Sequence, residues 1–101
     1  AALDAASGTG AVALVDCLTL WASNLLLTDA DMDRETAALT QAIARFEGQL
    51  ILVANEVGFG IVPDNALARR FRDAAGRINQ AVAAIADEVM LVVAGLPMRV
   101  K

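Results

Sequence analysis

Asp16 is the first residue whose type and position could do chemistry. It directly follows the short apolar run 11–15. An acid at the carboxyl end of a buried parallel strand is where phosphate-transferring α/β proteins order Mg²⁺ or hold a nucleotide. The same acid would also cap a helix that begins near Leu18, with Thr19 helping. The residues alone leave both interpretations of Asp16 open.

A second polar group follows the apolar run 50–54. Asn55 and Glu56 stand where this run ends, and Gly58 and Gly60 then flank Phe59. Glycines at such a turn permit a positive φ or a close approach of another backbone. A strand that ends in a polar, glycine-containing turn and feeds a helix is a common place for chemistry in open α/β sheets.

The helix that follows this turn has two contrasting faces. At 100° per residue, one face is polar and carries Arg69, Arg72, Asp73, Gly76, Arg77 and Gln80. A glycine inside a helix costs about 1 kcal/mol relative to alanine. In a chain so rich in alanine, Gly76 therefore favours contact with a partner or ligand over simple solvation of this face.

Two further patterns resemble ligand sites but are explained better as local structure. Asp29, Asp31 and Asp33 alternate like a calcium loop, yet Arg34 and Thr40 occupy the positions where an EF-hand has Gly and Glu. Helix capping and a favourable interaction with the helix dipole are therefore preferred to an independent metal-binding domain. The segment 7–10, SGTG, lacks the Lys and Ser/Thr of a phosphate loop and is predicted to be a turn.

These groups must be positioned by a small set of elements. Apolar runs predict strands over 11–15, 50–54 and 89–94, all of the buried kind. Helices are predicted to end near Ala6, to span 17–27 with most sides buried, to lead up to a stop at Gly48, and to start at a cap formed by Asp64 or Asn65. The apolar face of the last helix is formed by Leu67, Phe71, Ala74, Ile78, Val82 and Ile85. A turn over 95–97 and a short edge strand over 98–101, protected by Arg99 and Lys101, complete the chain. The order strand, helix, helix, strand favours right-handed crossovers and a parallel sheet.

Composition narrows the classes of protein further. The 101 residues are 57% hydrophobic with a mean hydropathy of +0.56, which favours part of a larger domain or a tight oligomer. No apolar run reaches the roughly 18–20 residues needed to span a bilayer, so no membrane span is expected. The net charge of −4 argues against nucleic-acid binding. The single Cys17 excludes an intramolecular disulfide and, with no signal peptide, indicates a cytoplasmic protein.

Three segments together resemble a known family. They are DCLTLWASNLL (16–26), ILVANEVGFGIVPDNALARRFRDAAGRINQ (51–80) and ADEVMLVVAGLPMRVK (86–101). They are similar to the bifunctional adenosylcobinamide kinase/adenosylcobinamide-phosphate guanylyltransferases of cobalamin biosynthesis. The resemblance runs from about Ala11 to the C-terminus, and its longest motif, NEVGxGIVP followed by LARxFRDxAGRxNQ, is specific.

The resemblance implies an α/β fold of the P-loop NTPase (RecA-like) class, with a mostly parallel sheet, helices on both faces and a short antiparallel edge strand, assembled as a homotrimer. It implies phosphorylation of adenosylcobinamide with ATP or GTP and Mg²⁺, and then transfer of GMP from GTP through a guanylylated histidine. It assigns Asp16 to the guanine nucleotide, although many relatives have Glu there. No catalytic residue and no metal ligand is assigned within this chain.

The sequence departs from the family in two ways. It contains no histidine and no GGxRSGKS-like phosphate loop. Residues 1–101 are therefore expected to form a single partial domain, the C-terminal portion, inactive alone. Its candidate site wall or subunit interface is Asn55, Glu56, Gly58, Gly60, Arg69, Arg72, Gly76 and Arg77. The alternative is a non-catalytic assembly or interaction module that uses the Arg69–Gln80 helix face.

Overall fold

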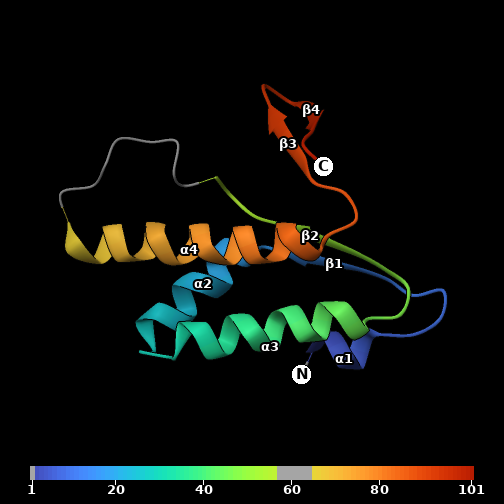
Figure 1. Ribbon diagram of the computed structural model, residues 1–101, viewed down its shortest axis with the longest axis horizontal. Coiled ribbons are helices and arrows are strands. Elements are labelled where there is room, and N and C mark those ends of the chain that lie inside the picture. Colours follow the sequence, from blue (N-terminus) through green and yellow to red (C-terminus); the bar gives the residue numbers. More distant parts are fainter. Residues whose placement is uncertain (1, 57–64) are drawn as a thin grey trace.

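The computed structural model describes residues 2–56 and 65–101 (Figure 1). Along the chain the elements are α1 (Ala2–Ala6), β1 (Val12–Asp16), α2 (Leu18–Leu27), α3 (Met32–Arg45), β2 (Gln49–Val53), α4 (Ala66–Ile85), β3 (Met90–Val93) and β4 (Leu96–Arg99). Gly58 and Gly60 of the predicted turn and Asp64 of the predicted cap lie outside the described residues. An α/β fold is confirmed at this level, and no helix in the described residues is long and apolar enough to cross a bilayer.

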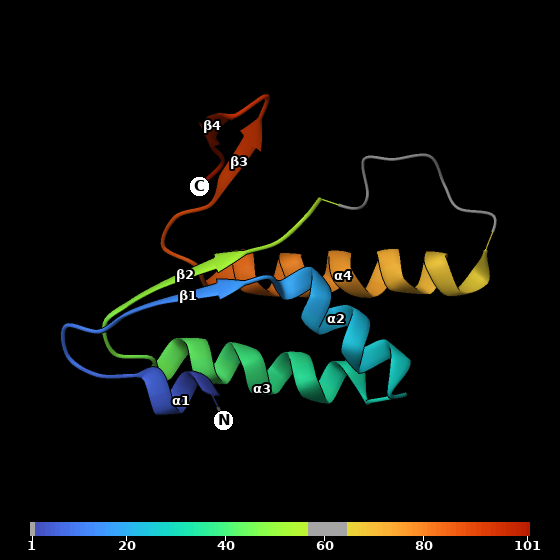
Figure 2. The ribbon, with the colours of Figure 1, turned by 180° about the vertical axis from the view of Figure 1, so that it is seen from behind.

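The first sheet is a parallel pair. β1 and β2 run side by side with Leu14 opposite Ile51 and Asp16 opposite Val53 (Figure 2). The two helices α2 and α3 connect the strands, as the predicted strand, helix, helix, strand order requires. The predicted parallel pairing of these two runs is therefore confirmed.

The core lies on one face of this pair. Val15 and Leu52 of the strands pack against a cluster of buried residues from α2 and α4. The members of this cluster are Leu18, Ala22, Ala75, Ile78 and Val82. The alternate strand residues Val12, Leu14, Ile51 and Val53 are exposed. Helices on both faces were predicted, but within the described residues they cover only one. For the same reason α2 buries one side rather than most sides, and its Leu20 and Leu27 face outward.

The apolar face of α4 is shifted and shortened relative to the prediction. Ile78 and Val82 are buried as expected, but Ala75 joins them in place of Ala74. Leu67 and Ile85, at the two ends of the predicted stripe, are exposed. The start of α4 projects beyond the start of α3, whereas α3 continues past the end of α4 (Figure 1).

The third predicted strand does not join the parallel pair. β3 instead pairs antiparallel with β4 in a separate hairpin that projects from the rest (Figure 1). Its apolar side chains are largely exposed, so the prediction of a buried strand over 89–94 is wrong for the described residues. The hairpin turn lies at Ala94 and Gly95, both with positive φ, rather than over 95–97. That geometry matches a two-residue hairpin turn, and β4 accordingly begins at Leu96, earlier than predicted.

Candidate functional site

Asp16 lies at the carboxyl end of β1, at the start of the connection to α2. Its side chain is exposed and makes no hydrogen bond or ion pair within the described residues. The N-cap of α2 is Cys17, and no side chain caps that helix end. The capping interpretation of Asp16 is therefore not supported, and its carboxylate remains available at this edge of the sheet.

The neighbouring strand end is fixed by two hydrogen bonds that the sequence did not reveal. The Asn55 backbone N–H donates to Thr19 Oγ1 at 2.8 Å, and Asn79 Nδ2 donates to the Asn55 carbonyl at 3.4 Å. Thr19 is buried. Helices α2 and α4 thus hold the chain just beyond β2, immediately before Glu56. Neither Thr19 nor Asn79 stands in a recognisable motif for this role, so only the fold identifies them.

Glu56 and the polar face of α4 line one open hollow of about 620 Å³: Glu56, Arg72, Asp73, Gly76, Arg77 and Gln80. This brings together four of the predicted wall residues and adds Asp73 and Gln80, which the helical wheel had placed on the same face. Asn55 is tied by its backbone and does not line the hollow. Arg69 is half-buried and also lies outside it. Gly58 and Gly60 are outside the described residues.

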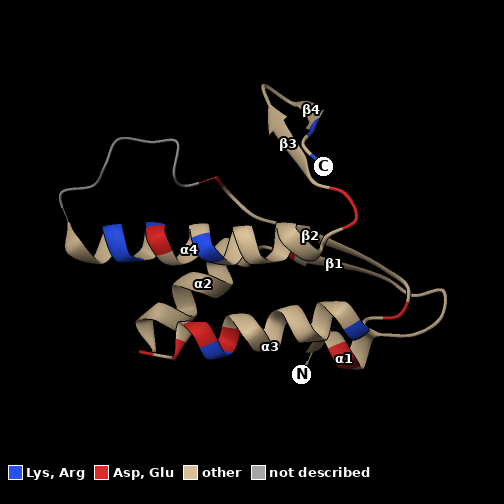
Figure 3. Cartoon of the chain, viewed as in Figure 1, with Lys and Arg blue, Asp and Glu red and all other residues tan. Residues whose placement is uncertain are grey.

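The charges of this hollow are partly neutralised. Arg72 Nη2 lies 3.0 Å from Asp73 Oδ1, and its Nε donates to the same oxygen at 3.2 Å. Glu56 and Arg77 make no hydrogen bond or ion pair within the part of the chain that the structure describes. Figure 3 shows the charged side chains of α4 as alternating blue and red bands along the helix. The hollow therefore offers one free carboxylate and one free guanidinium.

Gly76 has open space around it. A Cβ built at this position would meet no atom within 4 Å apart from the helix's own neighbouring backbone. No segment of the described chain packs there, so the close approach that the sequence predicted is not made by this chain itself. Contact with a ligand or partner at Gly76 remains a prediction.

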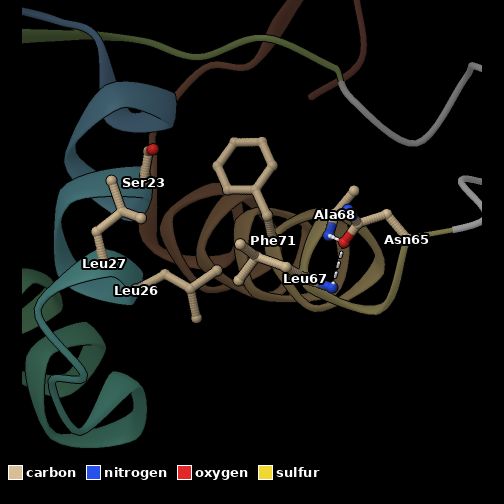
Figure 4. A pocket seen from close by; sticks show the side chains of 7 residues that line it. All are labelled: Ser23, Leu26, Leu27, Asn65, Leu67, Ala68 and Phe71. Atoms are coloured by element: carbon tan, nitrogen blue, oxygen red, sulfur yellow. Dashed lines mark hydrogen bonds between the residues drawn. The ribbon is translucent and has the colours of Figure 1, made fainter.

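A second, smaller hollow of about 240 Å³ lies between α2 and the start of α4. It is mostly apolar, and Figure 4 shows Phe71 among leucine side chains from both helices. Asn65 Oδ1 accepts from Leu67 N at 2.8 Å and from Ala68 N at 3.2 Å. This confirms Asn65 as the predicted cap of α4. Its side-chain oxygen is already used in the cap, so this hollow is a poor site for orienting a polar ligand.

The aspartate cluster and the SGTG segment, which resemble ligand sites in the sequence, both form hydrogen bonds that stabilise local structure. Asp31 caps α3 by accepting from Arg34 N at 3.2 Å, as predicted. In the SGTG segment, Ser7 Oγ accepts from Glu47 N at 2.7 Å, and Gly8 N donates to the Glu47 carbonyl at 3.1 Å. These bonds join the turn to the start of β2, which is a structural role.

Comparison with known proteins decides the family. A model of the cobinamide kinase / cobinamide phosphate guanyltransferase family matches residues 1–100. The chain belongs to this family. The match starts at the first residue, earlier than the Ala11 at which the resemblance had been placed.

Three curated relatives agree with this assignment. The bifunctional adenosylcobalamin biosynthesis protein CobP of Pseudomonas aeruginosa is 46% identical over 103 residues, covering 100% of this chain and 60% of the relative. The proteins named CobU from Salmonella typhimurium and Escherichia coli are each 43% identical, covering 87% and 89% of this chain and 57% and 58% of their own lengths. The chain thus spans about three-fifths of the length of the relatives it matches.

Proposed function

We propose that this chain is the C-terminal portion of an enzyme that phosphorylates adenosylcobinamide with ATP or GTP. The same enzyme would then transfer GMP from GTP to give adenosylcobinamide-GDP. Family membership supports the reaction class, because the matched model is named for both activities. The proposal includes a complete P-loop-like (RecA-like) sheet, a homotrimer and a cytoplasmic location.

The observation that carries the proposal is the free carboxylate of Asp16 at the carboxyl end of β1. Open α/β sheets bind nucleotides at this edge. Mg²⁺ in phosphoryl transfer is held by one or two carboxylates together with phosphate oxygens and waters. One exposed carboxylate with no other partner in the described residues fits that requirement. When bound, the cation would neutralise charge on the phosphates, and Asp16 would orient it or contact the guanine nucleotide directly.

The test is a fusion that places ahead of Ala1 the part of the Pseudomonas aeruginosa relative that this chain does not span, in which we expect the family's phosphate loop and histidine. We expect the fusion to transfer GMP from GTP and the 101-residue chain to transfer none, because a nucleotidyl intermediate needs a nucleophile. Asp16→Asn in the fusion should raise KM for GTP about tenfold, the effect of one charge-assisted contact. Asp87→Asn, an exposed acid on the loop after α4, is the matched control. GMP transfer by the isolated chain would contradict the proposed mechanism.

A second role is favoured by the uncovered polar face of α4. Because no described segment packs on Gly76, this Arg69–Gln80 face is also a candidate contact between copies of the chain. Light scattering on the wild type and Gly76→Leu tests this role. An unchanged mass in the two proteins would count against an interface there.

A further inference from the structure

The hollow beside α4 leads to a more specific inference, which rests on the proposed function. We propose that this hollow binds the cobinamide substrate by its peripheral carboxamide groups, while the nucleotide binds at Asp16. Cobinamide is a corrin macrocycle with primary carboxamides around its rim. Such a ligand needs hydrogen-bond donors and acceptors side by side, in a space large enough for part of a ring.

The lining of the hollow has that composition. Its four charged residues are two arginines and two acids, so their formal charges sum to zero. Arg72 and Asp73 already pair with each other. Glu56 can accept from a carboxamide NH₂ group, and Arg77 can donate to its carbonyl, while Gln80 can do either. A nucleotide triphosphate carries several negative charges and would gain little net attraction from a lining whose formal charges sum to zero.

The shape of the hollow agrees with a bulky neutral ligand. Gly76 lies among the longer polar side chains and leaves open space where a Cβ would project. The strand-end wall is held by the hydrogen bonds from Asn55 to Thr19 and from Asn79 to Asn55. A wall held by both helices is pre-positioned, which lowers the cost of ordering it when a ligand binds.

The position of the hollow relative to Asp16 also fits the substrate that accepts the transferred group. Asp16 is opposite Val53 in the parallel pair, and Glu56 follows Val53 by three residues. The two sites therefore lie at the same edge of the sheet, on adjacent strand ends. Phosphoryl and nucleotidyl transfer require donor and acceptor to meet in a defined geometry.

The experiment measures binding of dicyanocobinamide to the 101-residue chain by equilibrium dialysis, with the visible corrin absorption as readout. We expect saturable binding that Arg77→Ala weakens about five- to tenfold, through loss of one charge-assisted hydrogen bond. Gly76→Leu, which fills the hollow, should weaken it at least as much. Arg70→Ala makes the same change as Arg77→Ala, and Ala84→Leu adds a similar bulk to that of Gly76→Leu, both at exposed positions of α4 outside the hollow. Both should leave the affinity unchanged. Far-UV circular dichroism checks that each variant is folded.

A second corrinoid distinguishes recognition of the carboxamide groups from nonspecific binding of the corrin ring. Dicyanocobyrinic acid carries carboxylates where cobinamide has carboxamides, so it has no NH₂ group to donate to Glu56 and is repelled by that carboxylate. In a lining whose formal charges sum to zero, we expect its affinity to be at least tenfold lower. Equal binding of the two corrinoids would overturn the inference, as would an absence of dicyanocobinamide binding by the wild-type chain. Loss of oligomeric mass in Gly76→Leu, with dicyanocobinamide affinity unchanged, would assign the hollow to a second copy instead. If the fusion transfers GMP and requires Asp16 while Arg77→Ala and Gly76→Leu bind dicyanocobinamide normally, the proposed function stands and this inference fails.

Discussion

At the scale of single residues, the ends of the two parallel strands differ in how they are held. Asp16 makes no side-chain hydrogen bond in the described residues, whereas Asn55 is bonded through both its backbone N–H and its carbonyl. One strand end is thus free to meet a ligand, and the next is fixed to two helices. Thr19 is central to this difference because its hydroxyl, itself buried, accepts the Asn55 N–H.

Thr19→Val should test the importance of that bond. Valine keeps the shape of threonine but leaves the Asn55 N–H without its acceptor, which should lower the free energy of unfolding by about 1–2 kcal/mol. Urea unfolding measures the change. Thr40→Val is the control, because the Thr40 hydroxyl donates only to the Ala37 carbonyl of its own helix. Similar losses in the two variants would show that the bond to Asn55 has no special role.

Among the helices and strands, the features that depend on neighbouring residues could be predicted from the sequence. The runs that form β1 and β2, the cap at Asn65 and the polar face of α4 were predicted, because continuous apolar runs, capping residues and the helical period are visible in neighbouring residues. The pairing of β3 was not, since a continuous apolar run does not specify which strand lies beside it. The bonds from Thr19 and Asn79 join residues 36 and 24 positions away from Asn55. No local pattern encodes such contacts.

Gly48 was singled out by the sequence, but the role predicted for it was wrong. It was predicted to stop the preceding helix, but α3 ends at Arg45 with Phe46 as its cap. Gly48 instead has a φ of +102°, and a Cβ there would collide with the Ala11 carbonyl oxygen and lie 2.8 Å from that of Gly8. The glycine is needed where the turn before β1 crosses the start of β2.

Two glycine substitutions should therefore have opposite signs. Gly48→Ala should destabilise the protein by more than about 1 kcal/mol, because both the φ and the two carbonyls oppose a Cβ. Gly76→Ala should stabilise it by up to about 1 kcal/mol, because alanine is the better helix former and the space is open. Thermal unfolding of both variants measures the contrast. Destabilisation by Gly76→Ala would mean that some group does pack against that position.

The contact of α1 with α3 gives a pH-dependent prediction. Arg45 Nε and Nη2 donate to the two carboxylate oxygens of Asp4, each at 2.8 Å. These hydrogen bonds hold the pKa of Asp4 below its ordinary value of 3.8. A lowered pKa stabilises the folded state above the ordinary value, and the contribution is lost as pH falls through the lowered pKa.

Asp4→Asn should accordingly lower the thermal midpoint at pH 7, and the difference from the wild type should shrink as the pH falls through the lowered pKa of Asp4. Both side chains are exposed, so the effect should be small and should weaken in high salt. In an Arg45→Ala background, Asp4→Asn should lower the thermal midpoint less than it does in the wild type. A difference that persisted at low pH would contradict this origin.

At the scale of the whole molecule, the described residues leave a great deal of apolar surface uncovered. One face of the β1–β2 pair exposes Val12, Leu14, Ile51 and Val53, and the β3–β4 hairpin exposes apolar side chains on both faces. Monomeric proteins rarely leave such continuous patches open. Strands that are apolar on both faces are typical of parallel sheets with cover on each side. We expect the part of the relatives' length that this chain does not span to cover the open face of the pair.

Leu14→Ala should distinguish the chain alone from the completed protein. Leu14 is 65% exposed, so in the 101-residue chain the substitution should change the free energy of unfolding by less than about 0.5 kcal/mol. In the fusion, where we expect the open face to be covered, the same change should cost about 2–3 kcal/mol. Leu18→Ala is the matched control: Leu18 is 3% exposed in the core, so its replacement should be costly in both proteins. Denaturant unfolding of the four variants gives the comparison, and a Leu14→Ala effect that stayed small in the fusion would mean that the added segment packs elsewhere.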